Sequence, residues 1–227
     1  MLPHHHRHRT GSESPWATKP EGRDCLSTLP VWNGTRAVVL AITFCAVRLS
    51  VAGAGEITGT VKTTWRALSD AVVYIEKIEG KTFAPPRQPA VLDQVKITFV
   101  PHVLPVLVGS TVTLPNNDVV LHNVFSPRKD RQFDLGTYRP GSAKTIVCDR
   151  PGVIPLLCRV HHEMSGFIVV VPTPYYGVTD GKGAYRITGV PPGSYRLAAW
   201  HEAKALNVQD IIVPERGAVS ADFLMKR

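Results

Sequence analysis

The chain lacks an apolar run of the roughly 18 residues that a membrane-spanning helix requires. Its longest apolar tract, residues 37–47, is well short of that length and is interrupted by Arg48. Charged residues are also scarce, at 19% of the 227 residues, and aromatic residues make up only 7%. With 44% hydrophobic residues, the chain can nevertheless bury one substantial core or two small ones. The sequence therefore predicts a globular protein without a transmembrane helix.

Basic residues outnumber acidic ones, but they do not form the pattern of a nucleic-acid interface. The net charge is +8, and residues 55–227 contain no run of Lys or Arg interleaved with aromatic residues. An acidic protein partner or an anionic membrane surface remains open, and a solvated basic surface explains the same charge. No Ser/His/Asp arrangement can be argued from the spacing of these residues, so a hydrolytic enzyme is not indicated.

The apolar tract of residues 37–47 is typical of a secretory signal. Arg36 precedes it, and Ala52-Gly53-Ala54 provides the small residues of a cleavage site before Gly55. A buried core strand is the alternative for the same tract. We expect residues 1–54 to be a leader and the mature protein to be periplasmic or secreted. Residues 1–35 are long for the start of a signal, so either the true start lies further along or the leader is simply long.

Residues 55–227 have the pattern of short strands and frequent turns that is typical of an all-β protein. Short runs rich in Val, Ile, Tyr, Thr and Phe are bounded by Gly, Pro, Asn or Asp, and no stretch keeps a helical period for three turns. The chain also holds 19 prolines and 18 glycines, which suit frequent turns. The sequence predicts antiparallel β-sandwiches with strands at 71–75, 95–100, 111–114, 121–125, 145–148, 153–158, 166–171, 184–187, 195–200, 208–213 and 218–224.

Candidate metal ligands occur in two segments. His122 follows a polar turn, and Cys158, His161 and Met164 fall within seven residues of one another. A thiolate, two imidazoles and a thioether form the set expected for a copper ion that changes oxidation state. Cys158 ends a predicted strand and the next strand begins at residue 166, so the loop between them can direct its three ligands to one point. His122 must then come from elsewhere in the sandwich.

Several alternatives remain open at this site. His162 could replace His161 if the spacing were Cys-x3-His, although we favour His161. Zinc could occupy a Cys/His site, but Met is a poor zinc ligand. His102 and His201 are interpreted as surface or core-edge residues rather than ligands.

These segments resemble the cupredoxin family, the blue copper proteins such as plastocyanin and amicyanin. The resemblance covers roughly residues 91–172, and many relatives carry Pro where this chain has His162. It implies a Greek-key β-sandwich and a single type 1 (blue) copper ion. It also implies a ligand set and a residue that tethers the ligand loop: His122, Cys158, His161 and Met164 as ligands, with Asn123 as the tether. The resemblance rests on the motifs Phe99-Val100-Pro101, Val108-Gly109-Ser110-Thr111-Val112, Asn116-Asn117-Asp118 before His122-Asn123, Pro151-Gly152 and the Cys-x2-His-x2-Met loop.

The flanking residues resemble a carboxypeptidase regulatory-like, transthyretin-type β-sandwich. The resemblance rests on residues 59–61 and 68–74 near the start, and on residues 179–187 and 190–197 later. We favour a nested arrangement in which residues 55–82 begin this regulatory-like sandwich, residues 83–173 form an inserted cupredoxin domain, and residues 174–227 complete the regulatory-like sandwich. In the alternative tandem arrangement, residues 55–78 belong to the cupredoxin.

Cys148 and Cys158 are the cysteines outside the predicted leader, and an exported pair suggests a disulfide. If residues 145–148 and 153–158 form a hairpin, however, Cys148 faces about Val153 while Cys158 faces about Ala143. That register separates the two cysteines by more than the 7 Å or so that a disulfide spans. We expect Cys148 to be a small buried apolar residue.

The function predicted is that of a one-electron carrier with an unidentified redox protein partner, and not of an enzyme. A multicopper oxidase needs His-x-His pairs, and a binuclear copper centre needs a Cys-x3-Cys pair. Residues 55–227 contain neither motif. The alternative is a non-redox β-sandwich for copper storage, carbohydrate binding or adhesion.

Overall fold

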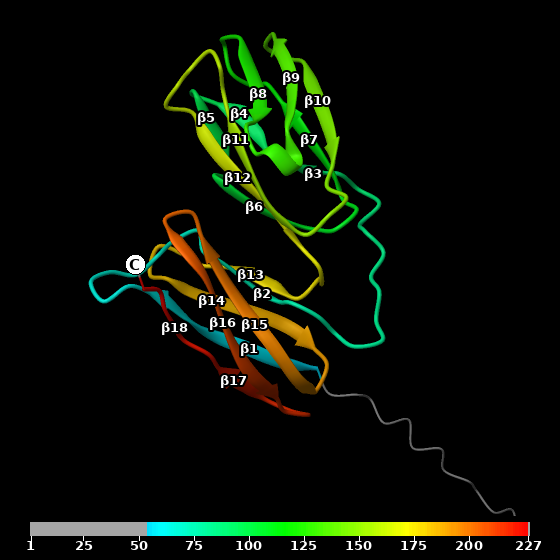
Figure 1. Cartoon of the computed structure of the whole chain (residues 1–227), viewed down its shortest axis with the longest axis vertical. Coiled ribbons are helices and arrows are strands. Elements are labelled where there is room, and N and C mark those ends of the chain that lie inside the picture. Colours follow the sequence, from blue (N-terminus) through cyan, green and yellow to red (C-terminus); the bar gives the residue numbers. More distant parts are fainter. Residues whose placement is uncertain (1–53, 227) are drawn as a thin grey trace, which may run out of the picture. The chain divides into compact units, whose positions relative to one another are not determined.

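The computed structural model describes residues 54–226, whose regular secondary structure is almost wholly strand (Figure 1). This confirms the all-β class, and no helix in this range is long and apolar enough to cross a membrane. The predicted leader, apart from Ala54, lies outside the described residues. The elements are β1 (Gly55–Lys62), β2 (Val72–Ile75), β3 (Ala90–Val91), β4 (Asp93–Val95), β5 (Thr98–Val100), β6 (Val103–Leu107), β7 (Thr111–Pro115), β8 (His122–Ser126), the 3-10 turn η1 (Lys129–Arg131), β9 (Phe133–Tyr138), β10 (Ala143–Val147), β11 (Gly152–Leu157), β12 (Ser165–Val171), β13 (Tyr176–Val178), β14 (Ala184–Val190), β15 (Gly193–His201), β16 (Lys204–Val213), β17 (Ala218–Ser220) and β18 (Phe223–Leu224).

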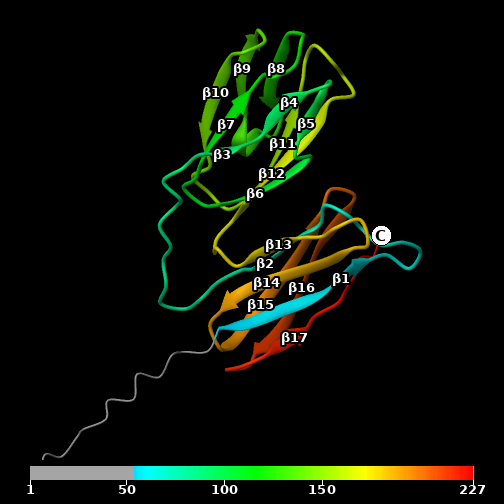
Figure 2. The same cartoon turned by 180° about the vertical axis from the view of Figure 1, so that it is seen from behind.

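The first sandwich combines strands from the two ends of the described chain. β1 pairs antiparallel with β14 and parallel with β17 and β18, while β2 lies between β13 and β15, and β15 pairs with β16. Figure 2 shows β1 beside β14 from the opposite side. β1 and β2, on residues 55–75, therefore pair with strands that follow residue 175 and with none of β3 to β12.

Alternating apolar residues explain the core of this sandwich. Ile57 and Val61 on β1, and Tyr185 and Ile187 on β14, point inward at every second position and are buried. Gly59 is required between them, because a Cβ atom there would lie 2.0 Å from the carbonyl oxygen of Ala221. The alternation buries one face of each sheet in a shared hydrophobic core.

The second sandwich is formed by residues 90–171. One sheet has the order β10-β7-β3, and the other has the order β6-β12-β11-β8-β9. Its core contains Phe99, Leu114, Leu156 and Ile168, all fully buried. β12 pairs parallel with β6 and antiparallel with β11, and β11 pairs in turn with β8. This pairing places the beginning of β8 and the end of β11 near each other at one end of the sheet.

Two details of the strands predicted in the second sandwich are wrong. The single strand expected at residues 95–100 is a hairpin of β4 and β5, joined by Lys96 and Ile97 with φ of 51° and 58°. The hairpin expected between residues 145–148 and 153–158 does not form either. β10 pairs with β7, whereas β11 pairs with β12 and β8, so the connection crosses between the two sheets. Cys148 marks the crossing, since its backbone pairs with Gly109 and Ser110.

Candidate metal centre

Three potential metal ligands converge at one end of the second sandwich. His122 is the first residue of β8, Cys158 follows β11 directly, and His161 lies in the loop that leads to β12. The Cys158 Sγ atom is 3.9 Å from Nδ1 of His122 and 3.9 Å from Nδ1 of His161, and the two Nδ1 atoms are 3.2 Å apart. Across residues 54–226, these side chains form the one group of His, Cys, Asp and Glu whose donor atoms are close enough to share a metal ion.

The spacing of these donors fits a bound metal. With metal–nitrogen bonds of about 2.0 Å and metal–sulfur bonds of about 2.3 Å, donors around a trigonal centre lie roughly 3.5–3.7 Å apart. The separations of 3.2 to 3.9 Å bracket that value. One thiolate and two imidazoles in a plane match the ligands of a mononuclear copper site better than those of a hard cation.

Met164, the expected fourth ligand, is buried in the same cluster as Cys158. It directly precedes β12, is 1% exposed and belongs to the same hydrophobic cluster as Cys158. Its backbone N–H donates to the carbonyl oxygen of His161 at 3.1 Å, which closes a tight turn in the ligand loop. The turn leads the chain back to β12, and Met164 is buried in the core just before that strand begins.

Burial differs between the two histidines. His122 is fully buried, and Cys158 is 4% exposed, whereas His161 is partly exposed. His162 is exposed and is absent from the cluster, so the two-residue spacing between Cys158 and His161 is the one that brings donors together. The group is therefore enclosed on the His122 side and accessible to solvent beside His161.

A carboxylate holds His122 in one orientation. The Nε2 atom of His122 donates to Oδ2 of Asp118 at 3.0 Å. The backbone N–H of Ile97, the His122 hydrogen bond and the N–H of Val119 lower the pKa of Asp118 to about 2. With Nε2 protonated, the lone pair of His122 lies on Nδ1, which is the atom that faces Cys158.

Asp118 belongs to the polar motif before His122, but its contact with His122 was not predicted from the sequence. The available signal was an acidic residue four positions before a candidate ligand. That spacing becomes informative only once the turn of residues 117–121 is known to bring the two side chains together.

Asn123 connects β8 to the ligand loop. Its backbone N–H points to Cys158 Sγ at 3.5 Å, and its side-chain oxygen accepts the N–H of Arg159 at 3.3 Å. Its Nδ2 atom donates to Asp134 on β9 at 2.6 Å. The Arg159 guanidinium also binds Asp134, and together with Asn123 and the N–H of Gly136 it lowers the pKa of Asp134 to about 2. These contacts are the ones expected of a residue that tethers the loop.

Cys148 is separate from the metal group. Both described cysteines are free, and Cys148 is 1% exposed. Burial raises the pKa of the Cys148 thiol to about 11. It therefore stays a neutral thiol at neutral pH. Its burial agrees with the small buried residue that the sequence predicted, although the hairpin on which that prediction rested does not form.

His102 and His201 do not join the metal group. His102 Nε2 lies 3.2 Å from the carboxylate of Glu202. His201 is 7% exposed and accepts the N–H of Ala203 at Nδ1, and burial lowers its pKa. Both residues therefore have local structural partners.

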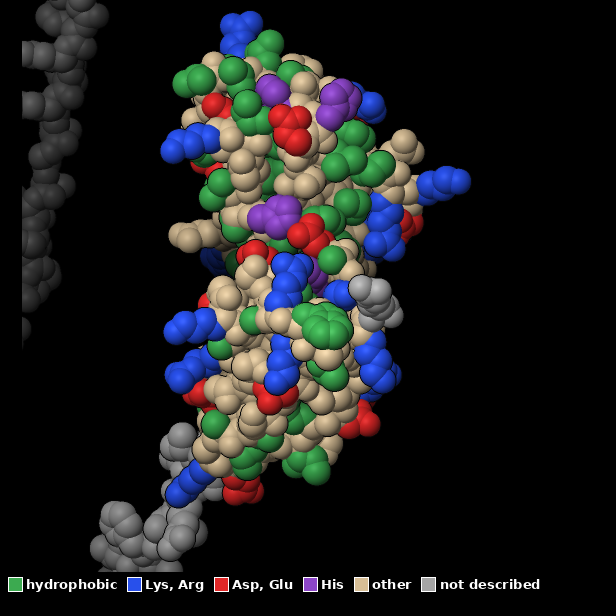
Figure 3. Space-filling model, turned by 90° about the vertical axis from the view of Figure 1, so that its left-hand side faces the viewer, with side chains coloured by type: hydrophobic (Ala, Val, Ile, Leu, Met, Phe, Trp, Pro, Cys, Tyr) green, Lys and Arg blue, Asp and Glu red, His purple; other side chains and the backbone are tan. Residues whose placement is uncertain are grey.

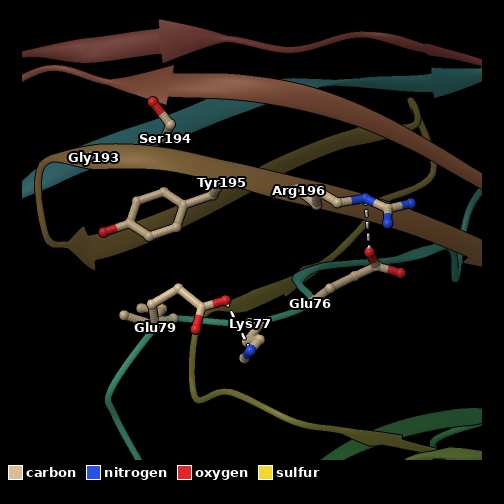
Figure 4. A pocket seen from close by; sticks show the side chains of 8 residues that line it. Glu76, Lys77, Glu79, Gly193, Ser194, Tyr195 and Arg196 are labelled. Carbon is tan, nitrogen blue, oxygen red and sulfur yellow. Dashed lines mark ion pairs between the residues drawn. The ribbon is translucent and has the colours of Figure 1, made fainter.

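A concavity lies on the first sandwich, between residues 76–79 and β15 (Figure 4). Its volume is about 690 Å³, and its charged residues form two ion pairs. Glu76 contacts Arg196 at 3.3 Å, and Lys77 contacts Glu79 at 2.8 Å. The charges that line this concavity are therefore compensated within the protein.

The chain is similar to several solved structures. No protein-family model matches the chain, and no curated protein sequence matches it. A purple cupredoxin from Nitrosopumilus maritimus is 25% identical, with 36% of this chain and 98% of that chain covered and a TM-score of 0.34. An oxidised amicyanin variant is 26% identical, with 36% and 81% covered and a TM-score of 0.35. A copper-containing nitrite reductase from Thermus scotoductus SA-01 is 24% identical, with 44% and 25% covered and a TM-score of 0.36.

These matches span less than half of the chain, so the assignment of the centre rests on its own geometry. Two packed sheets, with donors at the start of β8 and just after β11, form a β-sandwich with a site suited to copper. The resemblance of the other sandwich to a carboxypeptidase regulatory-like domain stays a prediction.

Proposed function

We propose that the protein is an exported one-electron carrier that holds one type 1 copper ion through His122, Cys158, His161 and Met164. The observation that carries this proposal is the convergence of one thiol and two imidazoles within bonding range of a single point. Copper bound there would supply a one-electron couple between its cuprous and cupric states. We propose a carrier rather than an enzyme.

The protein contributes a rigid set of donors. Cys158 and His122 sit at the ends of paired strands, and Asn123 joins those strands to the ligand loop. The N–H of Asn123 points to Sγ and stabilises negative charge on the sulfur. Because these positions are fixed by the sheet, the donors move little when the charge of the site changes, which favours rapid electron exchange.

Electrons would enter and leave beside His161. Three large apolar side chains on the two ligand-bearing segments are exposed: Val119 at 90%, Leu121 at 51% and Val160 at 44%. Exposed apolar residues around a partly exposed ligand suit brief contact with another protein. We therefore propose that the redox partner docks at this end of the sandwich.

A cysteine comparison tests the metal assignment. Cupric ions added to the purified protein should produce an intense visible charge-transfer band that mild reduction bleaches. Cys158→Ser should abolish the band, because a hydroxyl stays protonated where a thiolate is needed. Cys148→Ser is the matched control and should keep the band. The ligand assignment is wrong if the two variants behave the other way round.

Two further measurements address the carrier role and export. Voltammetry of the copper-loaded protein should show one reversible one-electron wave, whereas a storage protein would bind copper without such a wave. N-terminal sequencing of exported material should begin at or within a few residues of Gly55. Recovery of the intact chain embedded in the membrane would contradict the export proposal.

A further inference from the structure

The most exposed tryptophan of the described chain is displayed on an ordered turn. Trp65 is 87% exposed and lies between β1 and β2. The Thr63 hydroxyl accepts the backbone N–H groups of Trp65 and Arg66, and the N–H of Thr63 donates to the carbonyl oxygen of Arg66 at 2.8 Å. The turn is therefore held by hydrogen bonds while its largest apolar side chain stays in water.

Three cations share the same depression with this tryptophan. Arg66, Lys204 and Lys226 line it, its volume is about 410 Å³, and no acidic residue lines it. None of the three is ion-paired within residues 54–226. This contrasts with the concavity of Figure 4, where the charges neutralise one another.

Two carboxylates close in sequence to these segments already have partners. Glu202 contacts His102 at 3.2 Å, and Asp222 accepts the backbone N–H and the hydroxyl of Thr60 at 2.7 and 2.8 Å. Lys62, which lies close enough to Asp222 to lower its pKa, is left out of the group for that reason. The lining itself contains three cations and no carboxylate, so the depression has a local excess of positive charge.

Further exposed apolar residues border the depression. Leu224 is 48% exposed and precedes Met225, which lines the depression, and Leu206 is 49% exposed near the start of β16. Asn207 donates to the carbonyl oxygen of Leu224, so these two segments lie side by side. Figure 3 shows hydrophobic, basic and acidic side chains intermixed on one face of the molecule. We call Trp65, Leu206 and Leu224, with Arg66, Lys204 and Lys226, the basic tip.

We propose that the basic tip binds the surface of an anionic phospholipid membrane. Tryptophan favours the boundary between headgroups and acyl chains, because its ring is apolar and its N–H is polar. Lys and Arg beside it are attracted to anionic headgroups. An acidic protein would satisfy the charges, but apolar side chains from three separate segments are better matched by a continuous apolar layer. This proposal does not depend on the copper site.

Vesicle sedimentation of the full chain tests the proposal. The parent protein should bind vesicles of phosphatidylglycerol and phosphatidylcholine and bind phosphatidylcholine alone much more weakly. Trp65→Ala should weaken binding about tenfold. This factor corresponds to roughly 55 Å² of apolar surface that the indole ring buries in the membrane and alanine does not. The double variant Lys204→Gln/Lys226→Gln should weaken binding roughly 30-fold at low salt.

Matched variants separate the basic tip from the rest of the chain. Ile212→Ala removes another exposed apolar side chain, and Lys144→Gln/Lys182→Gln removes two exposed lysines elsewhere, so both should bind like the parent. The apolar tract of residues 37–47 is present in every variant and cannot produce a difference between them. A blue shift of tryptophan emission on binding should be smaller in Trp65→Ala.

Three results would overturn the proposal. The first is equal binding by the parent and both basic-tip variants, which would assign membrane binding to another segment. The second is equal binding to anionic and neutral vesicles. The third is binding to polyglutamate without binding to vesicles, which would indicate an acidic protein partner instead. Thermal melts of all variants establish that they remain folded.

Discussion

Replacement of Asn123 by Ala should weaken copper binding although Asn123 is not a ligand. The side chain is 2% exposed and makes two hydrogen bonds, from its Nδ2 to Asp134 and from the Arg159 N–H to its oxygen. Alanine removes both and frees the ligand loop from β8. The backbone N–H that points to Cys158 stays in place.

The size of the effect follows from those two contacts. The bond to Asp134 involves a charged acceptor and contributes about 1.5–3 kcal/mol, but Asp134 is 41% exposed and water replaces part of it. The longer bond from Arg159 contributes about 0.5–1 kcal/mol. We expect the free energy of unfolding to fall by about 2 kcal/mol. Copper affinity should fall roughly 10- to 100-fold, as is usual when a residue that orients ligands is lost.

Urea denaturation of metal-free protein and copper competition against a chelator measure the two quantities. Asn117→Ala is the matched control, because Asn117 is exposed and makes one surface contact with Asp93. It should change stability by no more than about 0.5 kcal/mol. Unchanged copper affinity in Asn123→Ala, with stability lowered as expected, would show that the tether does not act on the site.

Four other substitutions give separate outcomes. Cys148→Ser should lower the free energy of unfolding by about 1–3 kcal/mol, because it buries a hydroxyl; chemical denaturation measures this. In the native parent protein, alkylation of Cys148 should stay slow until the pH approaches the thiol pKa of about 11. Met164→Leu should keep the visible band and raise the reduction potential in voltammetry, because the weak axial ligand favours cupric copper. Asp118→Asn should also raise that potential, because it removes a negative charge that is hydrogen-bonded to a ligand. Thr179→Val removes two buried hydrogen bonds to the segment before β2 and should lower the melting temperature of the first sandwich, by an amount equivalent to about 2 kcal/mol.

The strands and the two donors of the ligand loop could be predicted because their signals are local, whereas His122 lies 36 residues before Cys158. Alternation of apolar residues marks β14 and β15, and the spacing of Cys158 and His161 places two donors in one short loop. The class of fold follows from the same alternation and from frequent turn residues. For these features, the residue types within a short window decide the structure.

The errors occurred where the structure depends on distant contacts. Lys96 and Ile97 form a left-handed turn without the Gly or Asn that usually marks one, and the N–H of Ile97 is bound by Asp118 from another segment. Pro151-Gly152 has the residues of a hairpin turn, yet the chain there passes from one sheet to the other. Neither outcome can be recognised without knowing which strands become neighbours.

The way the chain leaves and re-enters the first sandwich couples the folding of the two sandwiches. β2 ends at Ile75, whose N–H donates to the carbonyl oxygen of Tyr175 at 3.0 Å, just before β13. If the segment between them were unstructured, closing such a loop of about a hundred residues would cost roughly 4 kcal/mol in chain entropy. A folded insert reduces the number of conformations from which its two ends must meet. Stabilising the second sandwich, for example by a metal at His122 and Cys158, therefore also makes β2 and β13 easier to pair.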